Sequence, residues 1–213
     1  NYAAVDAGGN AVVKVEVPAE WANIVVKEEE HTADAARPDF VKKIVDPINA
    51  LKGDLLPVSA FNGREDGTWD NGTAAYEKRG IAVNVPEWKI GNCIQCNQCA
   101  YVCPHAVIRP FLATEEEAAA SGVEWKQGLG ETKEYKFRIQ ISPMDCTGCS
   151  NCVDVCPAKD KALVMRPLEE QMPQQKNWDY ITKNIGYKQV VDKTKSVKNL
   201  QFAQPLFEFS GAC

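Results

Sequence analysis

Two runs of cysteines dominate the chemistry that this sequence could perform. Each run has the spacing CxxCxxCxxxCP, and the second follows the first at a constant offset of 53 residues. Two residues between cysteines let a tight loop point its thiolates at one centre, and these soft ligands select zinc, copper(I) or iron-sulfur clusters. In chain order the cysteines are Cys93, Cys96, Cys99 and Cys103, then Cys146, Cys149, Cys152 and Cys156.

A disulfide framework and a pair of four-cysteine zinc sites are the alternatives. Disulfides do not suit a cytosolic chain of this size. Zinc sites usually pair two CxxC units that are separated by a dozen or more residues. Three ligands at successive CxxC steps, with a fourth before a proline, match the run of two-cluster bacterial ferredoxins, where the fourth cysteine ligates the other cluster. The spacing therefore favours two 4Fe-4S clusters.

This crossover of the fourth ligand predicts which cysteines share a site. Each run would complete the site of its partner, so two distant segments become one compact unit, and cluster assembly is coupled to folding. The first predicted set is Cys93, Cys96, Cys99 and Cys156, and the second is Cys146, Cys149, Cys152 and Cys103.

Residues beside the cysteines bear on the surroundings of each site. Pro104 and Pro157 have a fixed φ and no N–H group, so each can turn the chain away from a cluster. We interpret His105 as a structural or surface residue, because four cysteines already serve each cluster. Backbone N–H groups inside the loops could bond to sulfur, at Asn97, Gln98, Thr147 or Gly148. Apolar neighbours that would exclude water are Ile94, Tyr101, Val102, Val153 and Val155.

Each cysteine run lies between two short apolar segments. Residues 81–85 precede the first run, and residues 135–141 precede the second with an alternation that predicts a half-buried strand. Residues 106–110 and 162–167 follow the two runs. Strand, cysteine loop and strand, twice over, predict an α+β fold. The expected architecture is a bacterial two-cluster ferredoxin-like module with pseudo-two-fold symmetry and flanking helical and loop-rich segments.

The remaining segments suggest how the chain is organised. Residues 112–134 predict an acidic helix and a glycine-containing turn, inserted between the two repeats. The run Glu115, Glu116 and Glu117 within it is interpreted as a solvated helix start rather than a partner contact. We divide the chain into a linker and helical or loop segment (1–80), a ferredoxin-like domain (81–170) and a connector (171–213).

Three of the flanking segments have a recognisable pattern. Residues 38–60 space apolar side chains at helical intervals, with Pro47 expected to break or kink the helix. Residues 62–80 hold four glycines and predict an ordered loop. Residues 176–198 carry six lysines against two aspartates, which favours a solvated face over a surface that steers an acidic carrier. The apolar positions of the predicted helix are Phe40, Ile44, Ile48 and Leu51.

Composition and charge exclude several classes of protein. The chain has 213 residues, of which 45% are hydrophobic and 25% charged, so most of it is expected to be globular rather than disordered. A net charge of -5 argues against a nucleic-acid partner, which would need a clustered basic face. No membrane span or secretory signal can be recognised, and we infer a cytoplasmic protein with no membrane partner.

Several phrases resemble the pyruvate:ferredoxin (or flavodoxin) oxidoreductases. They are "LPVSAF" (56–61), "YEKRGIAVNVPEW" (76–88), the two cysteine runs with their flanks, and "FEFSGAC" (207–213). The cysteine runs alone would fit any two-cluster ferredoxin domain, whereas the flanking phrases are more specific. Together with the sequence between them, which is also similar, these segments cover most of the chain.

The resemblance implies a function larger than this chain. Members of the family oxidatively decarboxylate pyruvate on thiamine diphosphate with Mg, pass acetyl to coenzyme A, and send electrons through iron-sulfur clusters to ferredoxin or flavodoxin. This chain would be their internal electron-transfer segment, in contact with the remaining domains of a homodimeric enzyme. Cys213 would be a ligand of a third 4Fe-4S cluster completed outside this sequence, with a free thiol as the alternative. No catalytic residue is assigned, because no thiamine, Mg, pyruvate or coenzyme A motif falls within the chain.

Two other functions stay open at this point. One is a free-standing two-cluster ferredoxin carrier with extra segments. The other is an electron-transfer subunit of another 2-oxoacid oxidoreductase or multi-cluster enzyme, although such a subunit would not need "YEKRGIAVNVPEW" or "FEFSGAC".

Overall fold

The computed structural model describes residues 1–25 and 37–202. Contacts between residues divide the chain into two units, Asn1–Pro38 and Asp39–Cys213. In the described part of the first unit, α1 (Tyr2–Asn10) and a 3-10 helix (Ala19–Asn23) bury no side chain. The second unit contains every cysteine of the two runs, so the fold that matters for the chemistry is described there.

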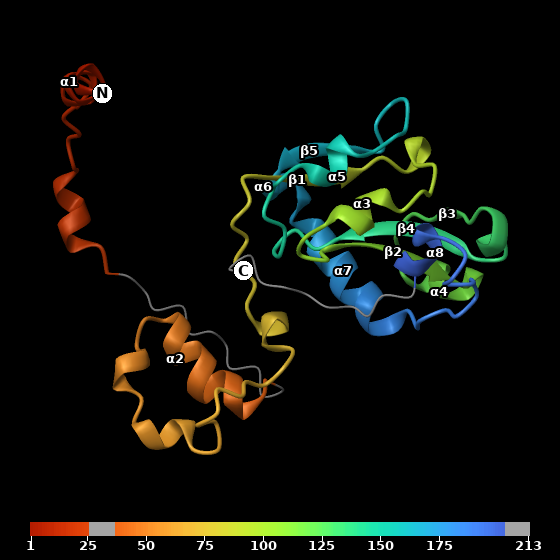
Figure 1. Ribbon diagram of the computed structural model, residues 1–213, viewed down its shortest axis with the longest axis horizontal. Coiled ribbons are helices and arrows are strands. Elements are labelled where there is room, and N and C mark those ends of the chain that lie inside the picture. Colours follow the sequence, from red (N-terminus) through yellow and green to blue (C-terminus); the bar gives the residue numbers. More distant parts are fainter. Residues whose placement is uncertain (26–36, 203–213) are drawn as a thin grey trace. The chain divides into compact units, whose positions relative to one another are not determined.

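The second unit places short helices and strands around the cysteine runs (Figure 1). Its strands are β1 (Asn84–Trp88), β2 (Ile108–Ala113), β3 (Lys126–Gln127), β4 (Lys136–Ile141) and β5 (Leu163–Pro167). Its α-helices are α2 (Asp46–Asn49), α3 (Gln98–Val102), α4 (Glu115–Ala120), α5 (Asn151–Asp154), α6 (Leu168–Gln171), α7 (Pro173–Asn184) and α8 (Val197–Gln201). A π-helical turn spans Val41–Val45, and 3-10 helices span Gly53–Leu55, Val58–Phe61, Thr73–Tyr76, Ile90–Asn92 and Gly130–Thr132.

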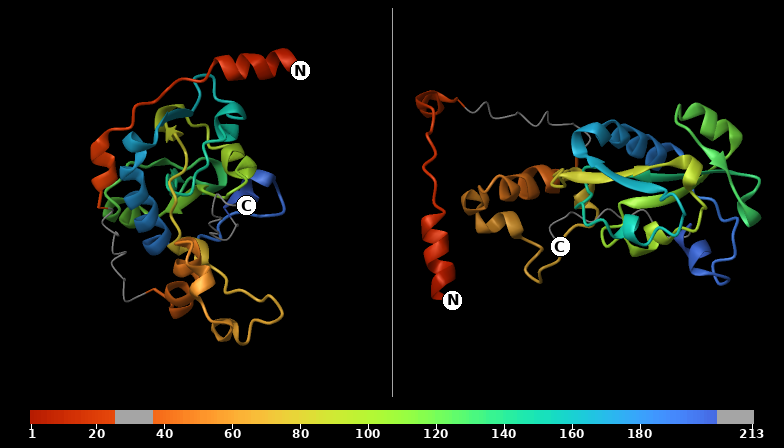
Figure 2. Two further views of the ribbon diagram at one scale, coloured as in Figure 1. Left: turned by 90° about the vertical axis from the view of Figure 1, so that its left-hand side faces the viewer. Right: turned by 90° about the horizontal axis from the view of Figure 1, so that it is seen from above.

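Two small antiparallel sheets flank the cysteine loops (Figure 2). In the first sheet β1 pairs with β5, and in the second β2 pairs with β4, whose other edge carries the short β3. The strand that precedes one cysteine run therefore pairs with the strand that follows the other run. This pairing joins segments that are far apart in the sequence and sets the two cysteine loops beside each other.

The strand predicted at residues 81–85 is displaced along the chain. β1 begins at Asn84 and continues through Pro86 to Trp88, while Ile81 and Val83 are exposed. A proline is tolerated there because β1 belongs to a two-stranded ribbon, in which one edge of each strand needs no hydrogen-bonded neighbour. The strand predicted at 106–110 is also displaced, to Ile108–Ala113, whereas those predicted at 135–141 and 162–167 agree with β4 and β5 to within one residue.

The prediction that β4 is half-buried is wrong. Arg138 and Gln140 on its second face are 7% and 1% exposed, because α7 packs across that face. Arg138 donates to Gln140 Oε1 at 2.8 Å and to the Glu124 carbonyl at 2.6 Å. Gln174 of α7 accepts hydrogen bonds from the side chains of both Arg138 and Gln140, each at 3.2 Å. The alternating polar residues of β4 therefore bond to a covering helix rather than to water.

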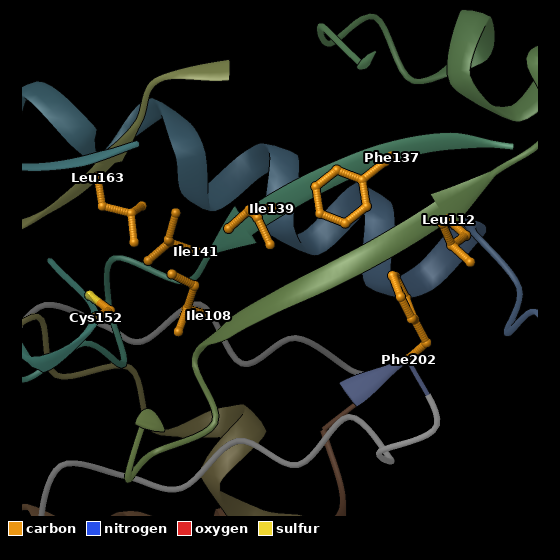
Figure 3. Packing of buried hydrophobic residues seen from close by; sticks show 8 residues of the cluster. All are labelled: Ile108, Leu112, Phe137, Ile139, Ile141, Cys152, Leu163 and Phe202. Atoms are coloured by element: carbon orange, nitrogen blue, oxygen red, sulfur yellow. The ribbon is translucent and has the colours of Figure 1, made fainter. Parts of the chain in front are cut away.

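Apolar side chains from both sheets form the main core (Figure 3). Phe137 and Ile139 of β4 and Ile108 of β2 belong to this cluster, and the thiol-bearing Cys152 lies in it too. The cysteine loops are thus fastened directly to the core. The remaining members of the cluster are Leu112, Ile141, Leu163 and Phe202.

Residues 39–49 form the helix that the apolar spacing predicted, with a π turn just ahead of Pro47. Proline cannot donate its backbone hydrogen bond, and a widened π turn accommodates the missing donor. Ile44 is buried, but Leu51 is 94% exposed with a φ of 58°, so the predicted apolar face ends before it. In the ordered loop over 62–80, all four glycines have positive φ, as expected for such a loop.

Candidate metal centres

The first candidate site collects three cysteines of the first run and one of the second. The thiol-bearing residues line a single pocket with Trp88, Ile139 and Leu163 as apolar walls. Three of the four lie around α3, and the fourth follows α5. The four cysteines are Cys93, Cys96, Cys99 and Cys156.

The second candidate site has the complementary composition. Its pocket is lined by three cysteines of the second run and the last cysteine of the first, with Val107, Ile108 and Ile141 among its apolar walls. His105 is half-buried and lies at the same pocket. The four cysteines are Cys103, Cys146, Cys149 and Cys152. The eight cysteines thus line two pockets, four in each.

Left-handed residues shape both cysteine loops in the same way. Gln95 and Gly148 have φ of 58° and 73°, and Asn97 and Ser150 have φ of 61° and 66°. Each pair is separated by the same 53 residues as the cysteines. A single left-handed residue reverses the chain locally, so that successive thiols can face one pocket instead of alternating around it. At position 148 the glycine itself indicates a positive φ, because glycine adopts it without strain. The residue type at Gln95 gives no such indication.

Backbone N–H groups point at sulfur in both sites. The N–H of Gln95 donates to Cys93 Sγ at 3.4 Å, the N–H of Gly148 to Cys146 Sγ at 3.4 Å, and the N–H of Ala162 to Cys156 Sγ at 3.3 Å. Of the four positions proposed from the sequence, only Gly148 is among these donors. Such bonds stabilise negative charge on sulfur and raise the reduction potential of a bound cluster.

Burial opposes ionisation of the thiols when no metal is bound. Loss of contact with water raises the pKa of Cys146 to about 11 and that of Cys152 to about 12, and it also raises the pKa of Cys99. Charge on neighbouring cysteines adds to this effect in each case. Four thiolates in one such pocket need a positive partner, which a metal centre provides.

The two sites are close neighbours. Helices α3 and α5 pack against each other, and the pKa of Cys99 in the first site is raised in part by Cys152 of the second. Both cysteines contact the main core cluster. Side chains of the main core cluster therefore line both four-thiol pockets.

Three polar residues hold the first loop, and the cysteine pattern alone did not reveal them. Gln95 is 1% exposed; it donates to the Gln127 carbonyl at 2.7 Å and accepts from the N–H of Leu129 at 3.1 Å. Lys126 donates to the carbonyls of Ile90 and Cys93 at 2.8 and 2.7 Å. These contacts come from the inserted segment that follows α4, which therefore covers the first loop.

The third polar residue ties the first loop to the end of the described chain. Asn97 is 2% exposed and donates to the carbonyl of Lys198, in α8, at 3.1 Å. At the second loop, Lys161 donates to the carbonyls of Val153, Asp154 and Cys156 at 2.9 to 3.0 Å. These lysines and amides satisfy loop carbonyls that no sheet or long helix can reach.

The expected shielding by apolar neighbours is only partly present. Val102, Val153 and Val155 are half-buried, and Ile94 lines the first pocket although it is 52% exposed. Tyr101 is 61% exposed, so that prediction is wrong for Tyr101. Cys213, proposed as a ligand of a further cluster, lies outside the described residues.

All eight described cysteines are free thiols. Among the described residues, no group of three or more Cys, His, Asp or Glu side chains is arranged as a site for one metal ion. The thiols are instead distributed around the walls of two pockets.

Comparison with known families agrees with these pockets. The 4Fe-4S dicluster domain family matches residues 92–159, which hold both cysteine runs. A domain of unknown function, named EKR, matches residues 26–82. The 4Fe-4S dicluster match identifies an iron-sulfur domain in this chain.

Whole-chain similarity extends beyond the cysteine loops. The chain is 50% identical to a pyruvate:ferredoxin oxidoreductase of Moorella thermoacetica and 48% identical to a pyruvate-flavodoxin oxidoreductase of Enterobacter agglomerans, in both cases over 100% of its length. Over its whole length the chain is thus similar to one segment of these pyruvate oxidoreductases. It is also 43% identical, again over its whole length, to a mitochondrial pyruvate dehydrogenase [NADP(+)] of Euglena gracilis.

The chain corresponds to a small part of these oxidoreductases. It spans 18% of the Moorella and Enterobacter proteins and 12% of the Euglena protein. The names of these three relatives differ in the electron acceptor, although all three contain a segment similar to this chain. Within residues 1–25 and 37–202, no helix is long and apolar enough to span a membrane.

Proposed function

We propose that this chain is the electron-transfer segment of a pyruvate:ferredoxin or pyruvate:flavodoxin oxidoreductase. The observation that carries the proposal is the pair of crossed four-cysteine pockets, which lie in the region that matches the 4Fe-4S dicluster domain. Whole-length similarity to pyruvate oxidoreductases supports the enzyme in which the segment works.

The donor set fits the proposed clusters. Each pocket offers four sulfur ligands, apolar walls and backbone N–H donors to sulfur. Cys93, Cys96, Cys99 and Cys156 would hold one cluster, and Cys103, Cys146, Cys149 and Cys152 the other. A bound 4Fe-4S cluster supplies one-electron redox chemistry whose potential depends on hydrogen bonds to sulfur and on exposure to solvent.

The contribution of the chain itself is ligation, spacing and exclusion of water. The left-handed residues turn each loop so that its thiols face inward, and the core holds Cys99 and Cys152 close to each other. Ile108, Ile139 and Ile141 lie in the apolar wall of one pocket or the other. The partly exposed outer side of the first run, at Ile94 and Tyr101, is where an external carrier could approach.

We infer a pseudo-two-fold relation between the halves of the module. Helices α3 and α5 begin 53 residues apart, and β1 shifted by 53 residues falls within β4. The β1–β5 and β2–β4 pairs are both antiparallel, and their registers differ by two residues. A shift of two residues keeps each side chain on the same face of its sheet. The domain scheme of 1–80, 81–170 and 171–213 is proposed on the same basis.

The longer protein would perform the remaining chemistry. We infer that it oxidises pyruvate and passes electrons to ferredoxin or flavodoxin, as the names of the relatives suggest. Decarboxylation with thiamine diphosphate and Mg, and the formation of acetyl-CoA, are inferred from the family resemblance alone. A third 4Fe-4S cluster that includes Cys213, a homodimeric assembly and a cytoplasmic location belong to this proposal.

The direct test is electron transfer to an acceptor. The anaerobically purified chain, reduced and freed of excess dithionite, is mixed with oxidised ferredoxin or flavodoxin, and the visible spectra of both proteins are followed. Oxidation of the chain with matching reduction of the acceptor is the expected result. A chain that carries iron yet reduces neither acceptor would contradict the proposed role, and a colourless, zinc-containing chain would return the cysteines to a structural role.

A further inference from the structure

Residues 78–85 lie against the second cysteine loop. Lys78 Nζ is 2.5 Å from Asp145 Oδ2, and the N–H of Gly80 donates to the carbonyl of Met144 at 2.9 Å. Asp145 directly precedes Cys146, the first cysteine of that loop. Two consecutive residues of the loop are therefore held from a segment more than sixty residues away in the sequence.

Close packing continues along the same segment. A Cβ atom at Gly148 would lie 2.8 Å from the carbonyl oxygen of Asn84 and 3.3 Å from Ala82 Cβ. Ala82 and Val85 are buried together with Cys146 in one apolar cluster. The backbone of residues 82–85 thus forms the wall against which the second loop rests.

The carboxylate of Asp145 is almost completely buried. Its side chain is 1% exposed, and Ser142 Oγ donates to the same Oδ2 atom at 2.6 Å. A buried carboxylate is costly unless it is paired and hydrogen-bonded. Lys78, whose side chain is 23% exposed, supplies the opposite charge.

The first loop has a different arrangement. Asn92, a neutral amide, occupies the position that corresponds to Asp145, and its side chain donates to the carbonyls of Asp160 and Lys161. The lysine beside the first loop is Lys126, which contacts the carbonyls of Ile90 and Cys93. Only the second loop, among the residues that the structure describes, carries a buried carboxylate directly before its first cysteine.

We propose that residues 78–85, the end of the EKR match and its continuation, brace the second cluster site, and that Lys78 sets the charge of that site by neutralising Asp145. The inference rests on the proposed function, because it concerns a cluster held by Cys103, Cys146, Cys149 and Cys152. The proposal assigns a role to the segment that matches EKR, because residues from the end of that segment pack against the second cluster site. Lys78 is a positioning residue that acts through Asp145.

Removal of the lysine charge has a defined consequence. A buried negative charge without its cation disfavours the added electron of a reduced cluster, because like charges repel more strongly in a low dielectric. At a fixed ambient potential, the ratio of reduced to oxidised second cluster should fall about tenfold in Lys78→Met, which corresponds to about 59 mV for one electron.

The experiment is a redox titration of the anaerobically purified chain, monitored by low-temperature EPR, with iron content measured on the same samples. The variants are Lys78→Met, the charge-conserving Lys78→Arg, Asp145→Asn and the double variant Lys78→Met/Asp145→Asn. Lys126→Met is the matched control, since it removes a lysine beside the first loop and identifies the EPR component of the first cluster.

We expect Lys78→Met to lower the midpoint of one component, and both Lys78→Arg and the double variant to restore it. Lys126→Met should move the other component, and Asp145→Asn alone should leave that component unchanged. Selective loss of the second cluster in Lys78→Met, restored in the same two variants, would equally support the brace.

Unchanged midpoints in Lys78→Met with both clusters retained would overturn this inference alone. So would an equal loss of both clusters that neither Lys78→Arg nor the double variant restores. A wild-type chain without iron would contradict the proposed function itself, so the two failures are distinguishable.

Discussion

Cys103 belongs to the first cysteine run by sequence and to the second pocket by position. It lies one residue past the end of α3, where the chain has already left the first pocket. Cys156 has the reciprocal position after α5, in the first pocket. At the scale of single residues, the exchange of these two thiols makes each half of the module depend on the other.

Substitution of the exchanged cysteines should remove clusters one at a time. We expect Cys103→Ala to lose the cluster held by Cys146, Cys149 and Cys152, and to retain about four of about eight irons. Cys156→Ala is the matched variant and should lose the other cluster. Iron analysis with EPR checks both, and selective loss of the Cys93, Cys96 and Cys99 cluster in Cys103→Ala would contradict the crossed assignment.

Gly148 is constrained twice, by its φ of 73° and by the Asn84 carbonyl 2.8 Å from a Cβ atom. We expect Gly148→Ala to lower the free energy of unfolding by roughly 2–3 kcal/mol, because left-handed strain and a backbone clash add. Gly122→Ala is the control: its φ is 66° but no atom lies within 4 Å, so only about 1 kcal/mol should be lost. Urea denaturation measures both, and equal losses would show that the contact with Asn84 is unimportant.

At the scale of elements, α4 illustrates a helix start whose acidic run has a structural role. The Thr114 hydroxyl accepts from the N–H of Glu117 at 3.2 Å, and Glu117 accepts from the N–H of Thr114 at 2.8 Å and pairs with Lys188 at 2.7 Å. This capping box begins the inserted segment that ends in the contacts to the first cysteine loop. Glu117 also ties that segment to the chain beyond α7.

Neutralising Glu117 should weaken this connection. Burial raises the pKa of Glu117, but hydrogen bonds and charge from Lys188 and Thr114 outweigh it, and the pKa is lowered below its ordinary value of 4.5. A lowered folded-state pKa means stability that is present above pH 4.5 and is lost as the pH falls through the folded-state value. We expect Glu117→Gln to cost about 1 kcal/mol at pH 7, with the difference from the wild-type chain shrinking below pH 4.5.

The control for this prediction is Glu116→Gln, in the same first turn but exposed. Urea denaturation followed by circular dichroism at several pH values compares the two variants. Equal costs at pH 7, or a Glu117→Gln cost that grows as the pH falls, would contradict the assigned role of the Lys188 pair.

At the scale of the whole molecule, the two sheets and two pockets form a single cross-linked unit. β1 pairs with β5 and β2 with β4, so each sheet joins the beginning of one half to the end of the other, as the exchanged cysteines also do. The short helices α3 and α5 have few internal hydrogen bonds of their own. Their stability therefore depends on the core and on the ligands bound by their cysteines.

Removal of the clusters should loosen this unit selectively. We expect oxidative removal of iron with a chelator to increase hydrogen exchange in α3, α5 and the loops before them. The helix over residues 39–49 should change much less, because its buried residues Val41, Ile44 and Val45 do not line either pocket. Hydrogen exchange measured by mass spectrometry checks this, and unchanged exchange in α3 and α5 would contradict coupling between metal binding and folding.

The local spacing of cysteines predicted three ligands of each set, because successive CxxC steps keep three thiols close together. The fourth ligand of each set rests on the crossover known for two-cluster ferredoxins and stays a prediction. The supporting contacts could not be predicted in this way. Gln95, Lys126 and Asp145 act on loops through partners that are distant in sequence, and their residue types are common on any surface. Arg138 and Gln140 misled the prediction for β4, because alternation cannot distinguish water from a polar helix layer.

The most direct test of the central claim is iron and acid-labile sulfide analysis of the anaerobically purified chain, with low-temperature EPR after reduction by dithionite. The account predicts about eight irons and about eight sulfides per chain, and a spectrum of two magnetically interacting reduced clusters. Zinc without iron in a colourless protein would contradict it.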